Sequence, residues 1–94
     1  MKGHLYRITL EHLEDAKGNP VEKPPMTFDV KNHDDLYDIV SRVQAKSLFD
    51  PEEARAFTIG LKLFREVMLH NRGIEAFQEL DPHMSQFMKA LKKL

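Results

Sequence analysis

Two short stretches that alternate apolar and polar residues limit the β-structure that this 94-residue chain can form. One covers residues 6–10 and the other residues 26–30. Alternation with a period of two is typical of a strand with one buried face. The apolar positions are Tyr6, Ile8, Leu10, Met26, Phe28 and Val30. Nothing in the sequence predicts a third strand, so we expect a single N-terminal antiparallel β-hairpin.

The two strands fit together if Ile8 lies opposite Phe28. This register places both apolar rows on one face and sets Arg7 opposite Asp29 on the other face, where opposite charges stabilise modestly. The connection, residues 11–25, is long for a hairpin. It contains a Gly-Asn-Pro sequence that favours a turn and a Pro-Pro pair that favours extended backbone.

The sequence after the hairpin predicts three or four helices. A first helix starts at the Asn-His-Asp-Asp sequence of residues 32–35, because these residues supply an N-cap and early carboxylates. The central helix covers about residues 51–70, and its start combines a capping Asp50, a proline at the first helical position and a glutamate at the third. A short segment over residues 74–80 and a last helix beginning at Asp81-Pro82 complete an α+β fold of the order ββααα.

The central helix has apolar residues on more than half of its circumference. Arg65 and Glu66 fall on the remaining polar arc. The apolar positions form two stripes, Phe57, Leu61, Phe64 and Met68 in one and Ile59, Leu63 and Val67 in the other. Gly60 lies between the stripes, and we interpret it as a point of close approach to another backbone. Gly60→Ala is therefore expected to destabilise the protein, despite the better helix propensity of alanine.

Composition excludes several classes of protein. The chain has no cysteine, so disulfides, thiolate metal sites and a cysteine nucleophile are excluded, and a reducing compartment is favoured. The net charge of −1 leaves no broad positive face for nucleic acid. No apolar run approaches the roughly 18 residues of a membrane span, and the N-terminal residues lack the apolar region of a secretory signal. We expect one cytoplasmic domain over residues 1–94 that binds neither nucleic acid nor membrane.

The densest group of potential metal ligands consists of His33, Asp34, Asp35 and Asp38, with His33, Asp34 and Asp38 as the candidates. On a helix, however, Asp35 points about 100° away from Asp34, so these carboxylates do not converge on one ion. Helix capping is the favoured interpretation, and we expect neither metal nor cofactor. The sequence also lacks a nucleophile elbow, a His-Glu-x-x-His motif and a phosphate-binding loop, so an enzyme is not favoured and no catalytic residue is assigned.

These observations favour a non-enzymatic protein-interaction module that self-associates. A lone hairpin has two open edges, and residues 5–10 lack proline and carry little charge, so this strand is the more open edge. Pairing with a second copy through Leu5, Arg7 and Thr9 predicts a symmetric homodimer. The identity of any other protein partner is open. The alternative is a small-ligand or metal-binding protein that uses residues 11–25 and the start of the first helix.

Three segments carry a resemblance to a known family. They are Gly3-His4-Leu5-Tyr6-Arg7-Ile8-Thr9, Asn32-His33-Asp34-Asp35-Leu36 and Ala56-Phe57-Thr58-Ile59-Gly60-Leu61-Lys62-Leu63-Phe64. With these segments the chain resembles, over essentially its whole length, a bacterial family of small single-domain proteins of unknown function. The resemblance implies a bacterial, cytoplasmic protein, and it brings no activity, cofactor or catalytic residue.

Overall fold

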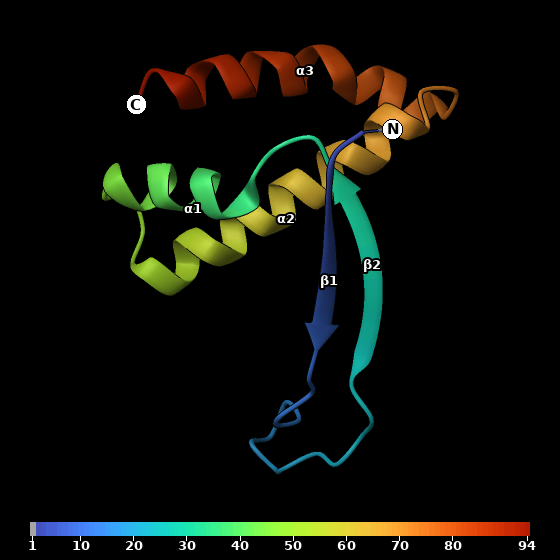
Figure 1. Ribbon diagram of the computed structural model, residues 1–94, viewed down its shortest axis with the longest axis vertical. Coiled ribbons are helices and arrows are strands. Elements are labelled where there is room, and N and C mark those ends of the chain that lie inside the picture. The colour runs from blue at the N-terminus through green and yellow to red at the C-terminus, as the bar shows by residue number, and fades with distance from the viewer. Residues whose placement is uncertain (1) are drawn as a thin grey trace. The chain divides into compact units, whose positions relative to one another are not determined.

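The computed structural model describes residues 2–94 and has two strands followed by three helices (Figure 1). The elements are β1 (His4–Leu10), β2 (Met26–Asn32), α1 (Leu36–Ala45), α2 (Pro51–His70) and α3 (Glu75–Lys92). The contacts divide into two compact units, a hairpin unit up to Asp34 and a helical unit from Asp35. The α+β class and the ββααα order are confirmed. The single domain over residues 1–94 stays a prediction.

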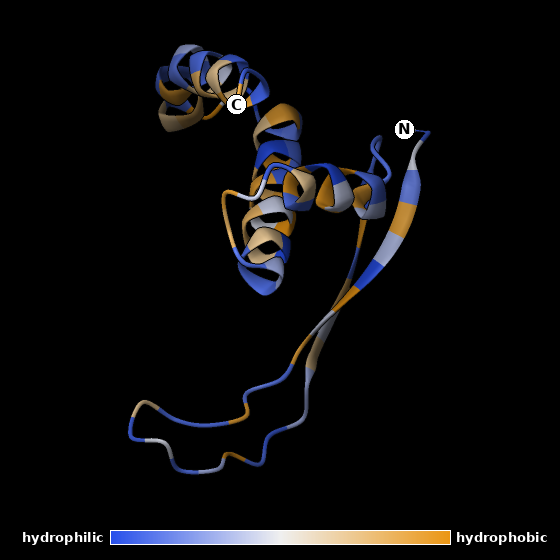
Figure 2. Ribbon diagram, turned by 90° about the vertical axis from the view of Figure 1, so that its left-hand side faces the viewer, coloured by the Kyte–Doolittle hydropathy of each residue, from blue (hydrophilic) through white to orange (hydrophobic). Residues whose placement is uncertain are grey.

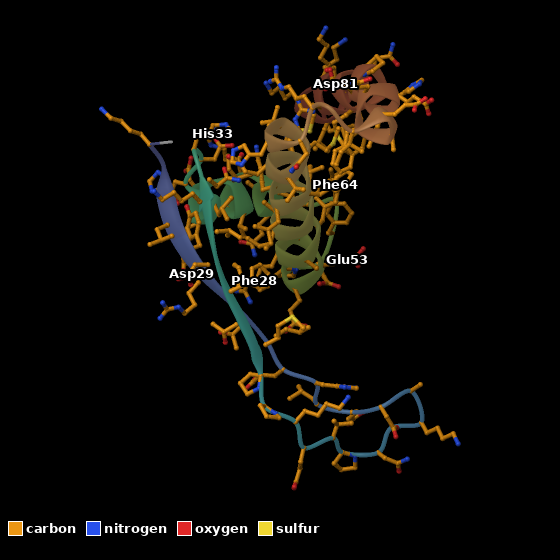
Figure 3. The ribbon with its side chains drawn as sticks, turned by 90° about the vertical axis from the view of Figure 1, so that its right-hand side faces the viewer. Phe28, Asp29, His33, Glu53, Phe64 and Asp81 are labelled. Atoms are coloured by element: carbon orange, nitrogen blue, oxygen red, sulfur yellow. The ribbon has the colours of Figure 1, made fainter. Side chains whose placement is uncertain are left out.

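The hairpin has the predicted register. Strands β1 and β2 are antiparallel with Ile8 opposite Phe28 and Arg7 opposite Asp29. Arg7 Nε donates a 2.9 Å hydrogen bond to Asp29 Oδ1. Phe28 and Asp29 lie on opposite faces of β2 (Figure 3), and the hydropathy alternates along both strands (Figure 2). The apolar rows therefore share one face, which we call the apolar face of the hairpin.

Gly3 and Asn32 lie at the end of the hairpin opposite its loop, next to the residues that lead into α1. A Cβ atom on Gly3 would lie 2.8 Å from the main-chain oxygen of Asn32, so only glycine fits there without a shift of the backbone. The buried Asn32 accepts a 2.9 Å hydrogen bond at Oδ1 from the backbone N–H of Asp34. Tyr6 donates its hydroxyl to the Asp34 carbonyl at 2.9 Å. These bonds fix the end of the hairpin unit.

Aspartate caps start the first two helices of the helical unit, as the sequence predicts. The Asp35 carboxylate accepts hydrogen bonds from the backbone N–H groups of Tyr37 and Asp38. Asp50 accepts a 2.8 Å bond from the backbone N–H of Glu53, and Pro51 occupies the first position of α2. Side-chain oxygens thus satisfy N–H groups that have no partner inside the helix.

The predicted break at Asp81-Pro82 is wrong. Helix α3 runs without interruption from Glu75 to Lys92 with Pro82 inside it, so the helical unit has three helices (Figure 1). Its N-cap is Ile74, which offers no side-chain hydrogen bond. An Asp-Pro pair is a strong start signal in local sequence, yet here the helix is already formed one turn and a half earlier. The local signal at Asp81-Pro82 therefore does not set the start of α3.

The buried apolar residues come from all three helices. They are Leu36, Val43, Ala54, Met68 and Met84. In α2 the buried face also includes Thr58 and Glu66, whereas Phe64 and Val67 are exposed. The prediction that Glu66 lies on a polar surface arc and Val67 in an apolar stripe is therefore wrong. The pattern of apolar and polar residues along a helix therefore locates its buried face only approximately, with an error of part of a turn.

Gly60 has open space around it, so its interpretation as a close-approach point is also wrong. No atom lies within 4 Å of a Cβ built on Gly60. Gly60→Ala should therefore stabilise the protein by up to about 1 kcal/mol, because alanine loses less backbone entropy in a helix. A urea melt of the variant against the parent measures this difference, and a loss of stability would contradict it.

Candidate functional site

A pocket of about 350 Å³ lies in the helical unit where α2 ends and α3 begins. We call it the arginine pocket because two arginines, Arg65 and Arg72, line it. Its other lining residues are Met68, Leu69, Phe77, Gln78, Asp81 and Ser85. The volume falls at the lower end of the range of roughly 300–1,000 Å³ that is usual for small-molecule sites.

Arg65 presents an incompletely satisfied guanidinium group to this pocket. Its side chain is 26% exposed, and its Nη1 atom is buried without a hydrogen-bond partner. The nearest carboxylate oxygen, Oδ1 of Asp81, lies 3.9 Å from Nη1, which is too far for a hydrogen bond. Asp81 projects from α3 (Figure 3). Buried polar atoms in folded proteins almost always have a partner, so this nitrogen needs an explanation.

The turn between α2 and α3 holds Arg72 at the pocket. The Gln78 side chain donates a 2.9 Å hydrogen bond from Nε2 to the main-chain oxygen of Arg72. Asn71 caps the end of α2 by donating from Nδ2 to the carbonyl of Val67 at 2.7 Å. The backbone of the turn is therefore fixed at both ends, while the exposed Arg72 guanidinium has no ion-pair partner within residues 2–94.

A second cavity of about 170 Å³ lies among α1, α2 and α3 and has mainly apolar walls, including Phe57, Leu61 and Met88. Thr58 also lines it, with 1% of its surface exposed. The Thr58 hydroxyl has no hydrogen-bond partner among the described residues. An apolar cavity of this size has room for a small molecule such as benzene.

Thr58→Val should raise the free energy of unfolding by about 1 kcal/mol. The substitution replaces an unsatisfied buried hydroxyl with a methyl group of the same shape, and both residues are β-branched. Chemical denaturation measures the change. A loss of stability would indicate that the hydroxyl makes a hydrogen bond in solution, for example to water in the cavity.

The predicted interaction residues all lie on the face of β1 opposite its apolar face. Leu5 is exposed, and Thr9 pairs across the hairpin with Thr27. Arg7 and Asp29 form an exposed ion pair, and their hydrogen bond raises the pKa of Arg7 and lowers that of Asp29. Within residues 2–94 no third strand pairs with the hairpin.

The loop of residues 11–25 is held by its own hydrogen bonds. The Asp15 carboxylate accepts 2.9 Å bonds from the backbone N–H groups of Lys17 and Asn19. These bonds, that to Asn19 first, lower the pKa of Asp15. Gly18 follows with a φ of 85°, a left-handed conformation that glycine adopts readily. The Asp15 carboxylate, in the loop that the ligand-binding alternative uses, thus builds a turn.

The structure does not gather the metal-ligand candidates into one cluster. His33 and Asp34 contact each other at 3.6 Å in the hairpin unit. Asp38 belongs to the helical unit and forms a 2.7 Å ion pair with Arg42, one turn further along α1. Among residues 2–94 no three histidine or acidic side chains are arranged to hold a metal ion.

Sequence reasoning missed the arginine pocket. It placed Arg65 on the polar arc of the central helix and ended that helix at about residue 70. One signal was present, because Arg65 and Arg72 are seven residues apart, which is about two helical turns. That spacing alone does not reveal the α3 residues that complete the pocket.

No helix within the described residues is both long and apolar enough to span a bilayer. The elements and the pocket together define a small α+β protein with an N-terminal hairpin and three helices. The chain belongs to the family described as a domain of unknown function with a solved structure, DUF3861, whose model matches residues 4–93. The resemblance to a family of unknown function is thereby confirmed.

A solved structure of similar sequence is the crystal structure of a protein of unknown function from Pectobacterium atrosepticum SCRI1043. The two chains are 34% identical, with a TM-score of 0.85, and the match covers 99% of this chain and 100% of the other. No curated protein matches the chain. The comparisons thus support the fold and the family and assign no activity.

Proposed function

We propose that the protein is a non-enzymatic interaction module of the cytoplasm that forms a symmetric homodimer through strand β1. The observation that carries this proposal is the two-stranded sheet, which has no third strand within the described residues. A strand edge without a neighbour is a template for pairing with another chain. A two-fold pairing of β1 with its copy turns two hairpins into one four-stranded sheet.

The sequence of β1 favours one particular register for this pairing. With Ile8 of each copy on the two-fold axis, Tyr6 lies opposite Leu10 of the second copy and Arg7 lies opposite Thr9. This register joins the apolar faces of the two hairpins and avoids placing the two Arg7 side chains opposite each other. Shifting the axis to Arg7 would set two like charges directly across from one another.

The apolar face of the hairpin has surface available for such an extension. Leu10 and its partner Met26 are 60% and 61% exposed, and Phe28 is also exposed. Figure 2 shows these apolar segments along the strands. Strand β2 is the less suitable edge, because two prolines precede it and it carries the charged Asp29 and Lys31. The dimer would therefore use β1.

Light scattering coupled to gel filtration tests the proposal at high micromolar protein concentration. We expect a mass of twice the 11.0 kDa of one chain. Leu10→Lys should give a monomer, because it places a charge beside Tyr6 of the second copy. Leu94→Lys is the matched control, since Leu94 is similarly exposed, at 65% against 60% for Leu10, and lies at the end of the helical unit. A monomeric parent protein contradicts the proposal.

Thr9→Pro provides a second check on the edge. Proline donates no ladder hydrogen bond and blocks strand pairing. If this variant stays both folded and dimeric, another surface holds the dimer and the pairing through β1 is wrong.

A further inference from the structure

We propose that the arginine pocket binds a small organic carboxylate with an apolar body. This site is separate from the proposed dimer edge, because every lining residue belongs to the helical unit. The inference rests on the charge of the pocket, the state of its two guanidinium groups, and the shape of its apolar wall.

The pocket has a net positive charge that one bound monoanion would neutralise. Two arginines and one aspartate line it, so two positive charges minus one negative charge leave a net charge of +1. Asp81 does not satisfy Arg65, because the separation of 3.9 Å leaves Nη1 without a hydrogen bond. Arg72 has no carboxylate partner in the part of the chain that the structure describes. A bound monoanion would neutralise the site and give the exposed Arg72 guanidinium group an acceptor.

Carboxylate geometry matches these donors. A guanidinium group presents N–H donors in a planar fork, which a carboxylate accepts in a bidentate arrangement. The hydrogen bond from Gln78 to the Arg72 carbonyl already fixes the backbone of the turn. Less conformational entropy is then lost when a ligand orders the Arg72 side chain.

Met68, Leu69 and Phe77 supply an apolar wall beside these charges. The Phe77 ring is held in place by an edge-to-face contact with Phe64, with ring centroids 6.1 Å apart. The volume of about 350 Å³ lies at the lower end of the range for small-molecule sites. The ligand therefore has on the order of ten heavy atoms, and a small aromatic carboxylate fits this description.

Titration of benzoate into the full chain, followed by two-dimensional NMR of the backbone amides, tests the proposal. We expect saturable shifts centred on residues 65–85. Arg72→Gln should weaken the binding about tenfold, since it removes a charge-assisted hydrogen bond. Arg55→Gln is the matched control, because Arg55 is an exposed arginine of α2 that does not line the pocket. It should leave the affinity unchanged.

Asp81→Asn should change the affinity for benzoate in the opposite direction from Arg72→Gln. Removing the nearby carboxylate raises the net charge of the pocket from +1 to +2, so benzoate should bind up to about fivefold more tightly. A residue with a merely structural role would not produce this increase. Arg72 lies in an exposed turn and Asp81 is exposed, so both variants are expected to fold, which the amide spectrum itself shows.

Four results would count against the proposal. The first is the absence of saturable shifts with benzoate. The second is equal binding of benzyl alcohol, which would show that the carboxylate contributes nothing. The third is binding of inorganic phosphate in preference to benzoate, which would assign the pocket to a different anion. Equal weakening by Arg72→Gln and Arg55→Gln would indicate general charge attraction and would likewise count against a defined site.

Discussion

Leu36→Ala should lower the free energy of unfolding by about 2–5 kcal/mol. Leu36 is the first residue of α1 and only 2% of its surface is exposed, which makes it the most deeply buried large apolar side chain among residues 2–94. Truncation removes buried methyl groups and leaves a cavity that the surroundings fill only in part. Urea denaturation measures the loss.

Leu13→Ala is the control for this prediction. Leu13 is the same residue type, but it lies in the hairpin loop and is 71% exposed. Its truncation should change the stability by less than about 0.5 kcal/mol. Equal losses in the two variants would mean that the burial of Leu36 contributes nothing particular to stability.

Pro82→Ala should raise the free energy of unfolding by up to about 3 kcal/mol. Pro82 lies inside α3, where it donates no hydrogen bond to the carbonyl four residues earlier and its ring crowds the preceding turn. Part of the gain is offset, by about 0.4–1 kcal/mol, because proline also restricts the unfolded chain. Thermal or urea unfolding of the variant measures the net effect.

Pro51→Ala is the matched control, because Pro51 occupies the first position of α2. The N–H group at that position has no partner inside a helix, so its absence costs nothing there. This variant should show no gain. If Pro82→Ala instead destabilises the protein, then the local geometry at Pro82 is required for the packing of α3.

The elements that local rules determine were predictable from the sequence. The register of the hairpin follows from alternation alone, because a slip by one residue would move Ile8 and Phe28 to the opposite face. The caps at Asp35 and Asp50 follow from the need of the first N–H groups for acceptors. In each case the feature depends on residues that are close together in the sequence or on one simple alternating pattern.

The features that depend on packing were not predictable in this way. Gly60 and Pro82 have strong local tendencies, yet Gly60 has open space around it and α3 continues through Pro82. The arginine pocket needs the turn after α2 to bring Arg72 and Asp81 to the same cavity. Nothing in the spacing of charged residues along the sequence indicates that arrangement.

The division of the contacts into two units also bears on how quickly the chain can fold. The element pairs with the most extensive contacts, β1 with β2 and α1 with α2, are neighbours in sequence. The loop between α1 and α2 is short, whereas the hairpin loop of residues 11–25 is long. Proteins dominated by contacts between sequence neighbours fold in microseconds to milliseconds. A hairpin forms in about 1–10 μs. Each unit can therefore begin to fold before the other has formed.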